Sequence, residues 1–172
     1  MTADDVLKLI KENDIRFVDF RFIDFPGTQQ HFTVPADQVD AGVFEEGLGF
    51  DASSIRGWAT IDQSDMLIVP DLTTVKIDPF YEHPTVSVLS DVVDPITRES
   101  YGRDPRGVAK RAEAYLKSSG LGDTAFIGPE LEFFLFSEAR FDYSSNSSMH
   151  FVDSIEGVWN SGYDEREDYG RP

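Results

Sequence analysis

The chain has 172 residues, enough for one ordinary domain or two small ones. It contains no cysteine, which excludes disulfides, thiol catalysis and cysteine-bound zinc, and a cytoplasmic location is expected. The formal net charge of −17 argues against nucleic acid and anionic membrane as partners, because both would repel it. The sequence has neither an apolar run of about 18 residues nor an apolar export signal, so no membrane span or secretion is expected.

The first 35 residues predict a helix followed by a β-hairpin. Residues 3–13 carry an apolar stripe at helical spacing, and Thr2 is suited to cap this helix. Residues 15–24 and 29–34 alternate as strands do, and the Pro-Gly turn at 25–28 joins them. One face of the first strand is expected to carry Val18, Phe20 and Phe22, and the other Phe17, Asp19 and Arg21.

The segments up to residue 95 complete a small α+β domain. Residues 35–47 predict one or two short helices. Three further strands are expected at residues 66–69, 73–77 and 85–93, where Pro, Asp and Gly separate apolar runs. One helix, that at residues 3–13, and about five strands around a single sheet form the expected unit.

Beyond residue 94 the pattern changes to a linker, one helix and a polar end. Asp104 and Pro105 predict a helix start, since they suit the N-cap and the first helical position. The helix is expected to end near Ser118, before Gly120. The buried face of this helix is expected to contain Val108, Ala109, Ala112, Tyr115 and Leu116. Farther along the chain, the composition of residues 143–148 is typical of a loop.

Residues 124–136 predict a buried strand, because the segment is too apolar and aromatic for a loop. Alternation along a strand puts Glu130 and Glu132 on the same side, about 7 Å apart. Neighbouring carboxylates in apolar surroundings need a proton or a cation, and hard divalent ions such as Mg²⁺ and Mn²⁺ prefer carboxylate oxygen. The pair is a candidate metal site. A solvated polar face and a purely structural pair are the alternative interpretations.

Residues 47–58 are rich in small and polar side chains and predict a surface loop with a half-buried Trp58. Asp51 lies in this loop, and Asp65 follows shortly after it. The glycine spacing of phosphate-binding loops is absent, so this loop alone is a weak indication of a site. His31 and His83 are predicted to be surface or hydrogen-bonded core residues rather than metal ligands.

Five ordered segments resemble the N-terminal part of bacterial type I glutamine synthetase. They are Phe17–Phe22, Phe50–Ile55, Ser64–Met66, Asp104–Arg106 and Gly128–Phe136. The resemblance implies an α+β fold, with a β-grasp-like N-terminal domain over residues 1–102 and the incomplete beginning of a catalytic α/β domain over 103–172. The scarcity of elements after Gly102 agrees with this, since they are too few to close a second core.

The resemblance also implies an activity, the ATP-dependent ligation of ammonia to glutamate through γ-glutamyl phosphate. It implies two Mg²⁺ or Mn²⁺ sites, with Glu132 for the ion nearer glutamate and Glu130 for the ion nearer the ATP phosphates. Asp51 would bind ammonium and help take its proton in a neighbouring subunit's active site, and Asp65 is linked to the same region. Trp58 matches an aromatic residue beside the nucleotide. Family members assemble as two stacked hexameric rings, which implies a homo-dodecamer.

One position departs from the family pattern: Ala52 stands where the family usually has glycine, and a positive φ there would strain it. Several further ligands and substrate-binding arginines of the family are absent, so we expect a truncated or partial form that makes no glutamine alone. Two alternative functions stay open. One is a γ-glutamyl ligase of the same fold that uses another amine, and the other is a non-catalytic assembly module.

Overall fold

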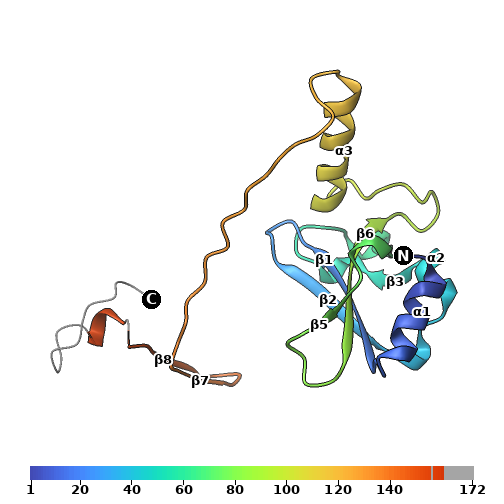
Figure 1. The fold of residues 1–172 in the computed structure, drawn as a ribbon. Coiled ribbons are helices and arrows are strands. Elements are labelled where there is room, and N and C mark those ends of the chain that lie inside the picture. The colour runs from blue at the N-terminus through green and yellow to red at the C-terminus, as the bar shows by residue number, and fades with distance from the viewer. Residues whose placement is uncertain (156, 161–172) are drawn as a thin grey trace. The chain divides into compact units, whose positions relative to one another are not determined.

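The computed structural model describes residues 1–155 and 157–160, and it contains two compact units. The first comprises Met1–Ala125 and the second begins at Phe126, and each is described by itself (Figure 1). The polar C-terminal stretch 161–172, part of the predicted second domain, lies outside the described residues. Within the described ranges, no helix has the length and apolar character needed to cross a membrane.

Helix α1 (Ala3–Glu12) forms as predicted, because its cap and its apolar stripe both favour it. Thr2 Oγ1 accepts a hydrogen bond from the Asp5 N–H at 3.2 Å, and Asp5 Oδ2 accepts one from the Thr2 N–H at 2.8 Å. This reciprocal capping box satisfies two N–H groups that a helix start would otherwise leave free. Val6 and Ile10, one turn apart, are buried and orient α1 toward the core.

The predicted hairpin is confirmed: β1 (Phe17–Ile23) pairs antiparallel with β2 (Gln29–Pro35). Gly27 adopts a φ of 94° in the turn, and the Asp24 carboxylate accepts the Thr28 N–H at 2.7 Å. The predicted apolar face of β1 is buried, with Val18, Phe20 and Phe22 in the core.

Six strands form one sheet in the order β2-β1-β6-β4-β3, and β5 pairs with β6 beside this path. Strand β1 runs parallel to β6, and the other pairs are antiparallel. The strands after the hairpin are β3 (Leu48–Asp51), β4 (Asp65–Pro70), β5 (Lys76–Asp78) and β6 (Thr85–Val93). The resulting α+β unit with a β-grasp-like sheet has the predicted fold class (Figure 1).

Two strand predictions are corrected by the structure. Strand β3 was missed, since four residues that include Gly49 cannot be distinguished from a loop until β4 pairs with them. Residues 73–77 are only partly extended, because a 3-10 turn, η4 (Leu72–Thr74), precedes β5. The Asp71 carboxylate accepts hydrogen bonds from both the N–H and the hydroxyl of Thr73, and this local capping competes with strand formation.

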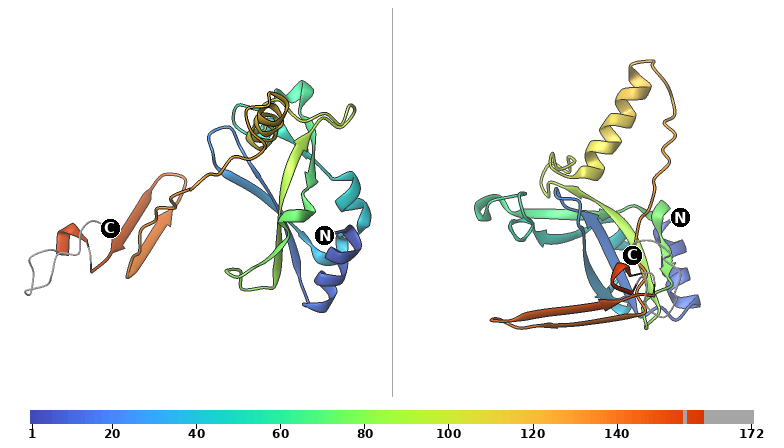
Figure 2. Two further views of the ribbon diagram at one scale, coloured as in Figure 1. Left: turned by 45° about the horizontal axis from the view of Figure 1, so that its top comes forward. Right: turned by 90° about the vertical axis from the view of Figure 1, so that its left-hand side faces the viewer.

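Short helices cover the predicted segment 35–47, namely the 3-10 turn η1 (Ala36–Gln38) and helix α2 (Ala41–Glu46). Figures 1 and 2 show α1 and α2 together against the sheet. The buried side chains of these helices pack with those of the strands in one hydrophobic core, which stabilises this face of the sheet. The buried residues of the core are Val6, Ile10, Ile15, Val18, Phe20, Phe22, Val39, Phe44, Ala52, Trp58, Met66, Ile68, Val86, Val88 and Val92.

Helix α3 (Pro105–Ser118) begins and ends where the sequence predicts. The Asp104 carboxylate is fully buried and accepts hydrogen bonds from the N–H groups of Arg106 at 3.0 Å and Val92 at 3.2 Å. Burial raises the pKa of Asp104, although these hydrogen bonds oppose the shift. Arg106 also pairs with Asp91 at 2.8 Å, so the first turn of α3 is tied to β6.

The predicted buried face of α3 is wrong. Val108 is 49% exposed and Tyr115 is 69% exposed, Ala109 and Ala112 are exposed, and only Leu116 is half-buried. The physical reason is that α3 projects beyond the sheet and contacts it through its N-terminal half, where Arg106 and Lys110 both pair with Asp91 (Figure 2). An apolar stripe favours a helix but does not supply the surface that would cover it.

The second unit contains an antiparallel hairpin of β7 (Glu138–Tyr143) and β8 (Ser148–Asp153), followed by the 3-10 turn η5 (Val158–Asn160). The predicted loop chemistry at residues 143–148 corresponds to the hairpin turn, where the Ser144 N–H donates to the Ser147 carbonyl at 2.9 Å. The flanking strands were not predicted, because the segment after Ser137 is predominantly polar and the alternation of Ala139, Phe141 and Tyr143 along β7 is short.

Candidate functional site

Two aspartates lie opposite each other where β3 pairs with β4. Asp51 is the last residue of β3, Asp65 is the first of β4, and the antiparallel register makes them direct partners. Directly opposite side chains project from the same face of a sheet, with Cβ atoms about 5 Å apart. Both aspartates are exposed, and like charges at such positions repel each other. The arrangement therefore favours a cation beside the pair.

Asp51 is held as a carboxylate by the turn that follows it. Its Oδ1 accepts a hydrogen bond from the Ser53 N–H at 2.8 Å, as the N-cap of the 3-10 turn η2 (Ala52–Ser54). Hydrogen bonding to Ser53, with a smaller contribution from Ser64, lowers the pKa of Asp51. Asp51 is thus ionised at neutral pH and fixed at a strand end, rather than in the loop that the sequence predicts.

Ala52 is not strained, which corrects the expectation drawn from the family pattern. Among the described residues, the non-glycine positions with positive φ are Asp14 and Arg98. Ala52 is fully buried, and its N–H donates to the Ser64 carbonyl at 2.8 Å. Its methyl group therefore fills core volume that a glycine would leave empty.

Trp58 is part of the core rather than half-buried, since only 2% of it is exposed. Its ring packs against those of Phe22, Phe50 and Tyr101, with centroid distances of 5.6, 6.2 and 5.4 Å. Its indole Nε1 is buried and has no hydrogen-bond partner within the described part of the chain. Trp58 also lines a cleft of about 280 Å³, whose other lining residues are Ala59, Thr60, Met66, Tyr101 and Arg103. A contact between Trp58 and a nucleotide stays a prediction.

The segment that carries Glu130 and Glu132 is not the buried strand that the sequence predicts. Residues 124–136 form neither helix nor strand and are exposed throughout, with Phe126 at 96% and Leu131 at 81%. A strand exists only through hydrogen bonds to a neighbouring strand, and none of the described residues pairs with this segment. The rings of Phe134 and Phe136 are stacked with their centroids 6.1 Å apart, so these two alternate side chains lie on the same side of the backbone.

The glutamate pair has the donor chemistry for a hard divalent cation but not a complete ligand set. No hydrogen bond or ion pair reaches either carboxylate from residues 1–155 or 157–160, so both keep their oxygen lone pairs available. Over the same ranges, no group of three or more His, Cys, Asp or Glu residues is arranged to hold a metal. Carboxylate oxygen suits Mg²⁺ and Mn²⁺, and a stable site needs further ligands.

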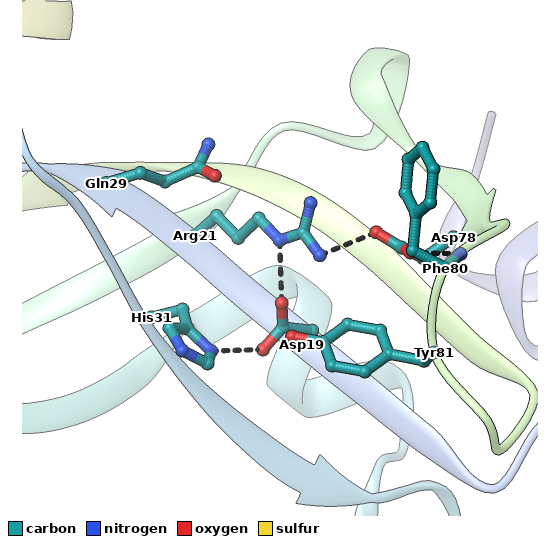
Figure 3. Close-up of a pocket in the computed structure, with 7 residues that line it drawn as sticks. All are labelled: Asp19, Arg21, Gln29, His31, Asp78, Phe80 and Tyr81. Atoms are coloured by element: carbon teal, nitrogen blue, oxygen red, sulfur yellow. Dashed lines mark hydrogen bonds and ion pairs between the residues drawn. The ribbon is translucent and has the colours of Figure 1, made fainter. Parts of the chain in front are cut away.

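A third cluster, around Asp19, was missed as a site by sequence reasoning. Asp19 is fully buried on the face of β1 opposite the core, and it accepts hydrogen bonds from Arg21 Nε at 2.6 Å and Thr33 Oγ1 at 2.8 Å. The His31 ring lies 2.7 Å from the same carboxylate, and Arg21 continues to Asp78 at 2.7 Å (Figure 3). The sequence feature that could have indicated this cluster is the oppositely charged pair Asp19 and Arg21, two residues apart in an otherwise apolar strand.

The Asp19 cluster lines an open cleft of about 450 Å³ together with Gln29, Phe80 and Tyr81 (Figure 3). Burial disfavours the Asp19 carboxylate, but hydrogen bonds from Arg21, His31 and Thr33 outweigh it and hold the pKa of Asp19 below its ordinary value. Its charged groups therefore satisfy one another, which suits a structural link between β1, β2 and β5. The prediction that His31 is a surface or hydrogen-bonded residue agrees with its exposed ring and its contact with Asp19.

Two family models match the chain in order. The β-grasp domain of glutamine synthetase matches residues 14–95, and the catalytic domain of glutamine synthetase matches residues 102–170. Glutamine synthetase of Microchaete diplosiphon is 53% identical over 164 residues, which are 95% of this chain and 35% of that protein. Glutamine synthetase of Escherichia coli is 50% identical over 161 residues, 94% of this chain and 34% of the relative.

A relative with a different name is equally similar. The 3-hydroxylaminophenol mutase of Cupriavidus pinatubonensis is 54% identical over 158 residues, 92% of this chain and 34% of its own length. The chain thus spans about a third of the curated relatives that it matches. Among solved structures, the cryo-EM structure of Plasmodium falciparum glutamine synthetase aligns with a TM-score of 0.72 at 23% identity, over 100% of this chain and 34% of that one. This likeness concerns the fold.

Proposed function

Because this chain belongs to the glutamine synthetase family, we propose that it forms part of an enzyme that ligates ammonia to glutamate at the expense of ATP, through γ-glutamyl phosphate. The two family segments follow each other in order, and several relatives of about 50% identity carry the name glutamine synthetase. Residues 1–102 would be the β-grasp-like domain and residues 103–172 the start of the catalytic domain. A cytoplasmic homo-dodecamer is part of the same proposal.

The observation that carries the proposal is the opposed pair Asp51 and Asp65. Two exposed carboxylates in direct register repel each other until a cation lies beside them, and ammonium is a cation that carboxylates bind by charge-assisted hydrogen bonds. The lowered pKa of Asp51 keeps it ionised, so it can hold ammonium by charge-assisted hydrogen bonds. The same carboxylate is proposed to take the proton that ammonium releases when it becomes ammonia. Its position at a strand end supports presentation to another subunit's active site.

Glu130 and Glu132 are proposed to hold one divalent cation each, Glu132 for the ion nearer glutamate and Glu130 for the ion nearer the ATP phosphates. When bound, Mg²⁺ or Mn²⁺ would offset charge on the phosphoryl oxygens during transfer. The two carboxylates would orient these ions, and the apolar side chains between and after them would exclude water once covered. Trp58 is proposed to lie near the nucleotide, at the wall of its cleft.

The test uses a protein of full family length that carries this sequence, assayed for glutamine formed from glutamate, ammonium and ATP. Asp51→Asn should lower kcat/KM for ammonium by roughly 100-fold or more, the usual contribution of a proton-transferring group. The matched control is Asp37→Asn, at an exposed aspartate whose side chain makes no hydrogen bond or ion pair among the described residues, and it should behave as wild type. An Asp51→Asn protein with unchanged kcat/KM for ammonium would contradict the assignment.

A second candidate function follows from the mutase relative, which is 54% identical. The same protein should therefore also be assayed with 3-hydroxylaminophenol and with amines other than ammonia. Conversion of 3-hydroxylaminophenol without glutamine formation would favour the mutase function, and preference for another amine would favour a different γ-glutamyl ligase. Absence of every activity would favour the non-catalytic assembly module.

A further inference from the structure

Arg103 reaches back over 45 residues of sequence to the turn that follows Asp51. It lies in the linker before α3, and its Nη1 donates to the carbonyl oxygens of Gly57, at 2.8 Å, and Trp58. Gly57 has a φ of 81°, a conformation that glycine adopts without strain, and this turns two consecutive carbonyls toward one guanidinium. Hydrogen bonds from a charged donor are stronger than those between neutral groups.

Beyond η2, two backbone hydrogen bonds in series hold the turn from Ala52 to Trp58 internally. The Ile55 N–H donates to the Ala52 carbonyl and the Trp58 N–H donates to the Ile55 carbonyl, each at 3.1 Å. One end of the turn is fixed, because the Ala52 N–H donates to the Ser64 carbonyl beside the paired strands. The other end is fixed by Arg103.

The indole of Trp58 cannot replace Arg103 through a hydrogen bond, because its Nε1 has no partner among the residues that the structure describes. It relies on packing, and one of its ring neighbours is Tyr101, two residues before Arg103. The linker thus contacts the same turn twice, once through a ring and once through a guanidinium. Removing the hydrogen bonds of Arg103 should therefore make the turn more mobile while the packing of Trp58 in the core is kept.

We propose that Arg103 is a positioning residue for Asp51. By fixing the far end of the turn, it keeps the Ser53 N–H on Asp51 Oδ1 and the carboxylate opposite Asp65. The catalytic consequence rests on the proposed function of Asp51. The restraint that Arg103 places on the conformation of the turn does not depend on that proposed function. This restraint can be measured without any substrate.

The experiment compares amide hydrogen exchange, residue by residue, in the 172-residue chain and its variants. In Arg103→Ala the amides of Ile55 and Trp58 should exchange about ten-fold faster, a change in keeping with the loss of hydrogen bonds from a charged donor. Arg103→Lys should recover part of the protection, since an ammonium group can still donate to these carbonyls. The control Arg16→Ala removes an exposed arginine whose side chain makes no hydrogen bond or ion pair in the described ranges, and it should leave exchange unchanged.

Unchanged exchange at Ile55 and Trp58 in Arg103→Ala would overturn the proposal, and so would equal acceleration of amides throughout the sheet. In the full-length protein, Arg103→Ala should raise KM for ammonium more than KM for glutamate, and Arg103→Lys should restore it in part. An equal change in both constants would contradict a role that acts through Asp51. A wild-type protein without ammonium-dependent activity would instead overturn the proposed function, and the exchange measurement would still decide the role of Arg103.

Discussion

Asp19 is a charged side chain that the fold buries completely. A buried carboxylate is costly unless hydrogen bonds and an opposite charge compensate it, and here Arg21, His31 and Thr33 do so. Arg21 remains partly exposed, with 17% of its side chain accessible, so solvent moderates the ion pair. The cluster therefore links three strands at one point and should matter for stability.

Replacing Asp19 with Asn should lower the free energy of unfolding by about 2–3 kcal/mol, because the partly buried guanidinium of Arg21 loses one of its two counter-charges and keeps only Asp78. Urea unfolding followed by circular dichroism measures this difference. Asp37→Asn is the control, since Asp37 is exposed and its side chain makes no hydrogen bond or ion pair in the described part of the chain. A loss below about 0.5 kcal/mol, as is usual for surface substitutions, would refute the structural role of the cluster.

The pH dependence of this difference has a definite sign. The folded-state pKa of Asp19 is lowered, so its contribution is fully present above the unfolded-state pKa of about 4 and is lost as pH falls through the folded-state value. The stability gap between wild type and Asp19→Asn should accordingly be constant near neutral pH and shrink in acid. A gap that widens in acid would exclude the ionised carboxylate as its source.

At the level of elements, the junction of α2 and β3 depends on one glycine. Gly47 has a φ of 88°, and a Cβ added there would lie 2.4 Å from the carbonyl oxygen of Ile68 on β4. Backbone atoms of a paired strand cannot move aside, so the close approach of α2 to β4 requires glycine. This contact sets the start of β3, and hence the position of Asp51 at its end.

Gly47→Ala should destabilise the protein by about 3 kcal/mol or more, through the left-handed backbone and the clash together. Gly27→Ala isolates the first effect, because Gly27 has a φ of 94° but open space around it, and it should cost only about 1 kcal/mol. Thermal and urea unfolding of both variants measure the two costs. Equal costs would show that the contact with Ile68 gives way.

Helix α3 shows what local signals can and cannot fix. Asp104 and Pro105 start it and Gly120, with a φ of 71°, follows its end, all readable from sequence because caps act within a single turn. Which of its faces is buried depends on surfaces far away in the chain. Tyr115 is therefore exposed although the apolar pattern predicts burial.

At the scale of the whole molecule, the first unit has a finished core, whereas residues 126–155 and 157–160 of the second unit form none. Fifteen buried apolar residues form the core, all of them before residue 93, whereas Phe126, Ile127, Leu131 and Phe133 are each more than 75% exposed. Apolar surface of this kind needs a covering partner to be stable in water. The described part of the second unit offers a hairpin whose strands are largely exposed themselves.

The 172-residue chain by itself is expected to form no glutamine. Its described residues hold no metal-binding group of three or more ligands, and two carboxylates alone do not fix two cations for phosphoryl transfer. Purified chain incubated with glutamate, ammonium, ATP and Mn²⁺ should give no glutamine above a heat-treated control. ATP-dependent glutamine formation that is lost in Glu130→Ala would show that the chain is sufficient.

The predictions that succeeded concern local interactions. Thr2 and Asp5 cap α1, Pro26 and Gly27 turn the hairpin, and the run at 85–93 forms β6 at its predicted bounds, since each depends on neighbours in sequence. The alternation of β1 predicted its buried face for the same reason. The roles of Asp51, Asp65, Trp58, Glu130 and Glu132 came from the family resemblance and stay predictions.

The amino-acid sequence by itself determined the helices, the hairpin, the α+β class and the family, because caps, turns and side-chain alternation are short-range properties. Only the tertiary structure decided that Asp51 and Asp65 are opposed and that Arg103 contacts the end of the turn that follows Asp51. The tertiary structure likewise decided that Asp19 is buried in an ion-pair cluster. It also decided that residues 124–136 form no strand. The physical reason is the same in each case: strand pairing and burial depend on residues distant in sequence, which no local pattern encodes.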